Sequence, residues 1–117
     1  MERKLTGNFE EENRRLHEIL QMDRNFDIVY KPFTVAGRRA GIYFIDGFMQ
    51  EAIMEKLMEF FYKLTPQELP PTAQEMLDRV IPYTEVNLLA DEDLVLQNLL
   101  TGLTCLFIEG YTECLGI

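Results

Sequence analysis

The chain has 117 residues, of which 47% are hydrophobic and 11% aromatic, and its formal net charge at pH 7 is −9. This length and apolar content suit one domain with a real core and argue against disorder. The excess of acidic residues disfavours binding to nucleic acid or to anionic lipid, since both need a basic surface. No run of about 18 apolar residues and no signal-peptide core are present, so we expect a soluble, cytosolic chain.

The N-terminal residues are polar, and we expect residues 1–8 to be disordered. An amphipathic helix is predicted over 9–22, because its apolar residues recur near one helical face. The segment 26–35 is rich in β-branched and aromatic residues, which predicts a strand. Pro32 has no N–H to donate to a neighbouring strand, so this strand is expected at a sheet edge or bulged there.

A hairpin is predicted next, with residues 36–39 as the turn and 40–47 as the return strand. The return strand is almost continuously apolar, which indicates burial on both faces and therefore helices on each side of the sheet. Thr72 begins a capping-box sequence that predicts a helix stopped by Pro82. Asp91 is the predicted N-cap of a later helix, which Gly102 ends. Further short strands are predicted over 83–89, 103–110 and 112–117.

Together with a helix predicted over 49–64, the element order is α-β-β-α-α-β-α-β-β. This order predicts an α/β fold, with α+β as the alternative, in which helices flank a mixed sheet of about five strands. We expect a single domain over 1–117. Because Leu115 and Ile117 continue an apolar stretch to the last residue, we also expect the chain to be the N-terminal part of a longer protein.

Two predicted strands end in an acidic residue followed by glycine, namely Asp46 before Gly47 and Glu109 before Gly110. Acids at strand ends can form a metal or catalytic site in open α/β sheets. They can also be turn residues, where glycine supplies an unusual φ and the acid contacts nearby backbone amides. We favour the turn interpretation. The alternative function is a free-standing cytosolic regulatory domain that binds metal through Asp46 and Glu109.

Other catalytic chemistry has little support in the sequence. The single histidine, His17, is expected at the surface among charged neighbours, so neither a catalytic triad nor a zinc site is indicated. Cys105 and Cys114 do not form a CxxC motif, and we expect both to be reduced and buried. We therefore expect no cofactor and no bound metal.

The predicted helix over 49–64 carries apolar residues on two sides, which leaves only a narrow charged strip. A helix that covers one face of a sheet usually buries one stripe and exposes charge opposite. Met54 and Met58 are therefore the candidate interface residues, because flexible methionine side chains suit an adaptable contact. The alternative is that another element, such as the 9–22 helix, covers them.

Residues 26–48 read FDIVYKPFTVAGRRAGIYFIDGF, which combines a strand, a basic glycine-bearing turn and an apolar strand ending in Asp-Gly. Residues 81–89 read IPYTEVNLL, and the chain then continues through a helix to CLFIEGYTECLGI at residues 105–117. These segments, in this order, resemble the GerA-type A-subunit family of spore germinant receptors over roughly residues 26–117. IYFIDGF and IPYTEV are most similar to the stage V sporulation protein AF branch of that family.

The resemblance implies a multi-pass protein of the inner membrane of bacterial endospores, with this soluble region on the cytoplasmic, spore-core side. It implies a non-enzymatic sensing and interaction domain that helps to relay germinant signals and release ions. The implied partners are other membrane subunits of a germination complex and the remainder of the same chain, with an oligomer formed by the full-length protein. Neither a nucleic-acid partner nor membrane insertion by residues 1–117 is expected.

Overall fold

The computed structural model describes residues 3–24, 27–47, 51–79 and 86–117, and its elements follow the predicted order. The helices are α1 Phe9–Ile19, α2 Glu51–Lys63, α3 Ala73–Arg79 and α4 Glu92–Leu100. The strands are β1 Ile28–Val35, β2 Arg38–Ile45, β3 Asn87–Leu89, β4 Cys105–Ile108 and β5 Cys114–Gly116. Among these helices, none combines the length and the apolar composition that crossing a membrane requires.

One five-stranded sheet forms the centre of the domain, in the order β1-β2-β4-β5-β3. The predicted combination of helices with one sheet is confirmed, but all four pairings between the described strands are antiparallel. The expected mixed sheet is therefore wrong. Strands β3 and β4 run in the same direction, since both pair antiparallel with β5, and α4 connects them. Because β5 lies between them, the parallel pair expected from this crossover does not form.

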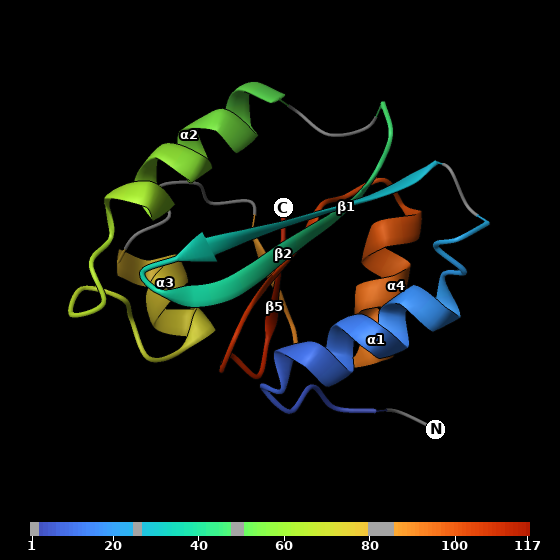
Figure 1. Cartoon of the computed structure of the whole chain (residues 1–117), viewed down its shortest axis with the longest axis horizontal. Coiled ribbons are helices and arrows are strands. Elements are labelled where there is room, and N and C mark those ends of the chain that lie inside the picture. The colour runs from blue at the N-terminus through green and yellow to red at the C-terminus, as the bar shows by residue number, and fades with distance from the viewer. Residues whose placement is uncertain (1–2, 25–26, 48–50, 80–85) are drawn as a thin grey trace.

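Helices cover both faces of the sheet, with α2 and α3 on one side and α1 and α4 on the other (Figure 1). On the first side, Leu57 and Phe61 of α2 pack in a cluster with Ile42 of β2. On the second side, the cluster includes Leu16 of α1 and Tyr43 of β2. Alternate residues of β2 thus enter opposite cores, which explains its continuously apolar sequence.

Strand β1 lies at the sheet edge, as its proline predicts. The Asp46 N–H donates to the Asp27 carbonyl at 2.7 Å, so the hydrogen-bonded pairs with β2 fall on odd-numbered residues of β1. Pro32, opposite Gly41, belongs to a non-hydrogen-bonded pair. Its nitrogen therefore points outward, where the missing N–H interrupts the edge and hinders pairing with another chain.

The N-terminal segment is ordered over residues 3–8, contrary to the predicted disorder of residues 1–8, of which 1 and 2 lie outside the described residues. The Leu5 N–H donates to the Ala90 carbonyl at 2.9 Å, and the Glu92 N–H donates to the Arg3 carbonyl at 2.8 Å. The Leu5 side chain is buried in the core beneath α1 and α4. Backbone pairing and apolar burial together hold this segment in place.

Local capping sets the other boundaries. Thr72 Oγ1 accepts a hydrogen bond from the Glu75 N–H at 3.1 Å, and Asp91 Oδ1 accepts one from the Leu94 N–H at 2.9 Å, so both predicted caps are confirmed. Pro82, the predicted helix stop, lies outside the described residues. The hairpin turn is shorter than the predicted 36–39. Only Ala36 and Gly37 lie between the paired strands, and both have positive φ, as a tight hairpin requires.

Candidate interaction surface

The two strand-end acids lie at opposite ends of the sheet. Strand β2 pairs antiparallel with β4 so that Ala40 faces Ile108, and the Glu109 N–H donates to the Arg39 carbonyl at 2.8 Å. Glu109 therefore lies beside the start of β2, whereas Asp46 follows its end, seven residues further along. At 3.2–3.4 Å per residue the two acids are separated by roughly 23 Å. They cannot share a metal ion, which overturns the metal-binding alternative.

Each acid precedes a glycine with positive φ, +88° at Gly47 and +90° at Gly110, as expected for glycines that end these strands. Glu109 accepts from the Arg39 N–H at 3.3 Å and from Arg39 Nη2 at 2.8 Å. The Arg39 guanidinium lowers the pKa of the Glu109 carboxyl. The Asp46 side chain is exposed and has no hydrogen bond within the described residues. The expected contact between acid and backbone amide thus exists only for Glu109.

Metal-binding chemistry has no further support in the described residues. Across residues 3–24, 27–47, 51–79 and 86–117, no group of three or more His, Cys, Asp or Glu side chains gathers closely enough to hold a metal ion. Asp91 instead caps α4, Glu11, Glu92 and Glu109 form ion pairs, and the buried Glu12 accepts hydrogen bonds from the Thr6 and Gly7 N–H groups.

The methionines of α2 differ in their accessibility. Met54 is only 8% exposed and shares a buried stripe with Leu57 and Phe61 at helical spacing, so its predicted exposure is wrong. Met58 is half-buried and packs against the same cluster. The sheet and α3 supply that cluster, whereas α1 lies on the opposite face (Figure 1). The alternative that another element covers the methionines is therefore correct for Met54, but the covering elements are the sheet and α3 and not the 9–22 helix.

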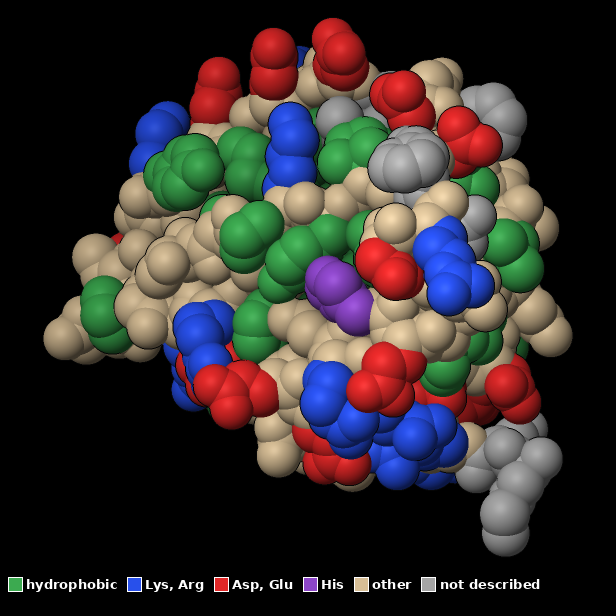
Figure 2. Space-filling model, turned by 45° about the vertical axis from the view of Figure 1, so that its right-hand side comes forward, with side chains coloured by type: hydrophobic (Ala, Val, Ile, Leu, Met, Phe, Trp, Pro, Cys, Tyr) green, Lys and Arg blue, Asp and Glu red, His purple; other side chains and the backbone are tan. Residues whose placement is uncertain are grey.

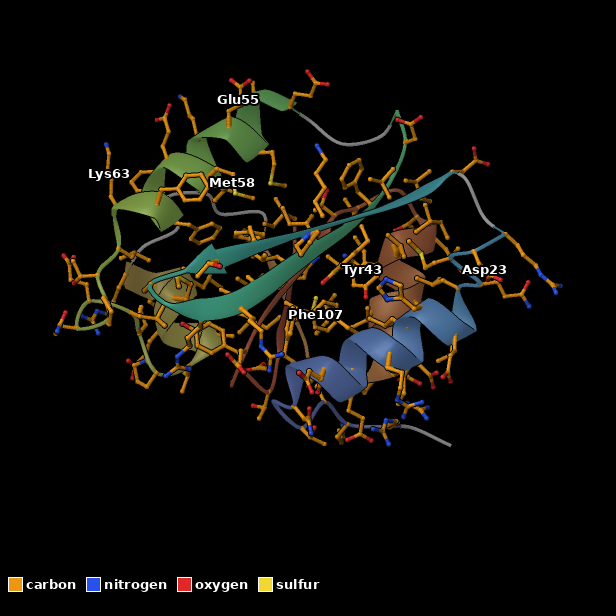
Figure 3. The ribbon with its side chains drawn as sticks, in the orientation of Figure 1. Asp23, Tyr43, Glu55, Met58, Lys63 and Phe107 are labelled. Carbon is orange, nitrogen blue, oxygen red and sulfur yellow. The ribbon has the colours of Figure 1, made fainter. Side chains whose placement is uncertain are left out.

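The exposed apolar surface of α2 lies on its flanks. Phe60 is 41% exposed and Tyr62 is 68% exposed. Tyr62 follows Met58 by four residues and therefore continues the same flank, while Phe60 lies on the other flank. Glu55 and Lys63 point away from the sheet (Figure 3). The described apolar side chains of α2 that reach solvent are thus Tyr62, beside the half-buried Met58, and Phe60 on the other flank.

A polar cluster that the sequence did not indicate connects α1 to the sheet. The Tyr43 hydroxyl donates to Asn13 Oδ1 at 3.0 Å and lies 2.9 Å from His17 Nδ1. Asn13 Nδ2 donates in turn to the Tyr30 hydroxyl at 3.1 Å. Tyr43 points from the sheet toward the α1 and α4 layer (Figure 3), and burial raises its pKa. Since Tyr43 is almost fully buried, its hydroxyl positions α1 and does not meet solvent.

His17 is half-buried and not fully at the surface as predicted, because its ring packs edge-on against Tyr30 and Tyr43. Its outer edge is visible at the centre of Figure 2. A shallow hollow beside it contains side chains of both charges and opens widely to solvent. The hollow is lined by Arg14, His17, Glu18, Gln21, Met22, Asp23 and Arg24.

Charged side chains on the α1 side pair with one another. Arg15 binds Glu92 through two hydrogen bonds of 2.9 Å, and Arg3 binds Glu11 at 2.7 Å. Figure 2 shows blue and red side chains interleaved along the lower part of this face. Charges of both signs therefore alternate along this part of the face.

The two cysteines are free and buried, as predicted. They lie on the neighbouring strands β4 and β5 and belong to the core that α1 and α4 cover. The Cys105 thiol donates to the Val95 carbonyl at 3.6 Å, and burial raises the pKa of the Cys114 thiol well above its ordinary value. Both therefore act as small apolar core residues.

The structure defines a layered α/β domain, in which polar groups hold elements together and apolar side chains remain exposed on the flanks of α2. Residues 14–117 match the family model for the Bacillus/Clostridium GerA spore germination protein. Because this match covers most of the chain, the protein belongs to the GerA family, and the resemblance seen in the sequence is confirmed. No curated protein matches the chain.

The fold is shared with a solved structure, the crystal structure of the N-terminal domain of the A subunit of the Bacillus megaterium spore germinant receptor GerK3. The TM-score is 0.79 at 17% sequence identity, and the match covers 100% of this chain and 48% of that one. At this identity the likeness concerns the fold alone. The chain spans about half the length of the matched structure.

Proposed function

We propose that this domain is a non-enzymatic sensing and interaction module of a germination protein in the spore inner membrane, on the cytoplasmic, spore-core side. In this role it relays germinant signals to other membrane subunits and contributes to ion release. The observation that carries the proposal is the GerA family match over residues 14–117. The shared fold with the N-terminal domain of a germinant receptor A subunit supports it.

The contact with a neighbouring subunit is proposed to form on the Met58–Tyr62 flank of α2. Tyr62 is 68% exposed, and aromatic side chains are enriched at the energetic centres of protein interfaces. Met58 beside it is half-buried and can adjust its side chain to a partner. Met54, buried against the sheet, is excluded from this contact.

The test uses the full-length protein in spores, with Tyr62→Glu as the variant and Phe60→Glu as the matched control on the other flank of α2. We expect Tyr62→Glu to reduce co-isolation of the other germination subunits and to slow ion release after germinant addition. Phe60→Glu should leave both close to wild type. Equal protein levels in the spore membrane would show that the substituted chains fold.

Two outcomes would contradict the proposal. If neither variant alters germination, although deletion of the protein does, the α2 contact is wrong and the family role stands. If deletion leaves germination and ion release unchanged, the sensing role itself fails. Because the segments IYFIDGF and IPYTEV resemble the stage V sporulation protein AF branch of the family, we also propose that the chain belongs to that branch. A downstream sequence that lacks several apolar segments of about 20 residues would contradict that assignment.

A further inference from the structure

The C-terminal end of α4 carries an exposed apolar patch, formed by Leu100 and Leu103. We infer that this patch docks the part of the longer protein that follows residue 117. The inference rests on the proposed function, because it requires this chain to be the first part of a longer soluble region. Beyond that function, the inference specifies the surface on which the two parts of the protein meet.

Both leucines are exposed at the end of α4, Leu100 as its last residue and Leu103 three residues further on. Leu100 is 66% exposed and Leu103 is 38% exposed. Leu100 lies one turn beyond the half-buried Leu96 on the same face of α4, and Leu103 follows the helix directly after Gly102. The apolar surface therefore runs from the core at Leu96 to solvent at the end of α4. An apolar surface that runs from core to solvent is suited to continue into a packed neighbour.

The helix end itself explains why Leu103 has no apolar partner within α4. Gly102 has φ +96°, its N–H donates to the Leu99 carbonyl, and the Leu103 N–H donates to the Asn98 carbonyl. This is the Schellman arrangement, in which the residue in the position of Leu103 commonly packs on an apolar side chain one turn back. Here those positions hold Gln97 and Asn98. The leucine is held at the surface by backbone hydrogen bonds without its usual contact.

The chain end lies directly beside the patch. Thr104, the residue after Leu103, exchanges two backbone hydrogen bonds with Ile117, of 2.9 and 2.8 Å. Figure 1 places the C-terminus at the same end of the sheet as the last turn of α4. A chain that continued from Ile117 would start within one residue of Leu103 along the sheet, so it would need no long linker to cover the patch.

The length of the matched receptor domain identifies the occupant. That chain is about twice as long as this one, since the match covers 48% of it and all of this chain. A second copy of this chain is a less suitable occupant, because a net charge of −9 on each copy opposes self-association. The remainder of the same polypeptide meets the patch at high effective concentration, since it is tethered beside it.

The test measures thiol labelling at single introduced cysteines, because the two natural cysteines are buried and free. The variants are Leu100→Cys and Leu103→Cys. Leu94→Cys is the matched control, since Leu94 is 41% exposed and lies at the opposite end of the same helix. Each is prepared in the 1–117 chain and in the full-length protein in membranes, and labelled with a bulky maleimide without denaturant.

We expect Leu100→Cys and Leu103→Cys to label about tenfold more slowly in the full-length protein than in the 1–117 chain, while Leu94→Cys changes little. Equal rates in the two lengths would overturn the inference and leave the germination role intact. Protection of Leu94→Cys to the same degree would show general shielding and also overturn it. Protection within the 1–117 chain that grows with its concentration would identify a second copy as the occupant. A reading frame that stops at Ile117 would remove both the inference and the proposed function.

Discussion

Removal of the Tyr43 hydroxyl tests the polar cluster that joins α1 to the sheet. In Tyr43→Phe the ring keeps its packing, with ring centroids 5.8 Å from Phe107 and 4.7 Å from Tyr30. The lost group is the hydroxyl that donates to Asn13 Oδ1 at 3.0 Å. Within the described residues every buried side-chain nitrogen and oxygen has a hydrogen-bond partner. The substitution would therefore leave one acceptor unpaired where none is unpaired now.

The stability that Tyr43→Phe loses depends on which hydrogen bonds of the cluster remain. His17 Nδ1 keeps the Asn13 carbonyl as a partner at 2.8 Å, and Asn13 Nδ2 keeps the Tyr30 hydroxyl at 3.1 Å. Only Asn13 Oδ1 loses its donor. An unsatisfied buried acceptor costs about 1–3 kcal/mol, and because Asn13 is half-buried the lower end applies, about 1–1.5 kcal/mol. For a domain of this size that corresponds to a fall in Tm of roughly 4–6 °C.

Urea unfolding of the 1–117 chain, followed by far-UV circular dichroism, measures this cost. The midpoint should fall while the m-value stays unchanged. Tyr111→Phe is the control on the opposite face, where the Tyr111 hydroxyl donates to the Pro70 carbonyl at 2.6 Å. The losses of unfolding free energy caused by Tyr111→Phe and Tyr43→Phe should add in the double variant. Those caused by Asn13→Ala and Tyr43→Phe should not add, because both remove the same hydrogen bond. Full additivity with Asn13→Ala, or a change below about 0.3 kcal/mol for Tyr43→Phe alone, would refute the reasoning.

Three further outcomes are expected. Because Arg39 lowers the pKa of Glu109, the stabilisation from their ion pair is present above the ordinary carboxyl pKa and lost as pH falls through the lower folded value. Glu109→Gln should therefore lose less stability on acidification than wild type, and an identical acid titration would contradict this. Asp46→Ala should change stability by less than about 0.5 kcal/mol, because that side chain is exposed, and Mg²⁺ or Mn²⁺ should not raise Tm. Cys105 and Cys114 should react with a bulky thiol reagent only after unfolding, so rapid labelling of the native chain would contradict their burial.

Local chemistry in the sequence was enough to predict the elements and several of their boundaries. Thr72 and Asp91 cap helices because a side-chain oxygen reaches a backbone N–H three residues on, an interaction contained within one turn. Pro32 places β1 at an edge because the missing N–H cannot be accommodated between two strands. The continuously apolar β2 predicted helices on both faces for a similarly direct reason.

What the sequence could not supply depends on contacts between distant segments. The insertion of β5 between β3 and β4 makes the described sheet antiparallel, and the resulting register separates Asp46 from Glu109. Met54 and Met58 look alike in a helical pattern, and only packing against the sheet and α3 buries the first more deeply than the second. The bond from Tyr43 to Asn13 spans 30 residues, so nothing local predicts it. Strand order, register and burial are set by which segments meet, and that is decided only when the whole chain folds.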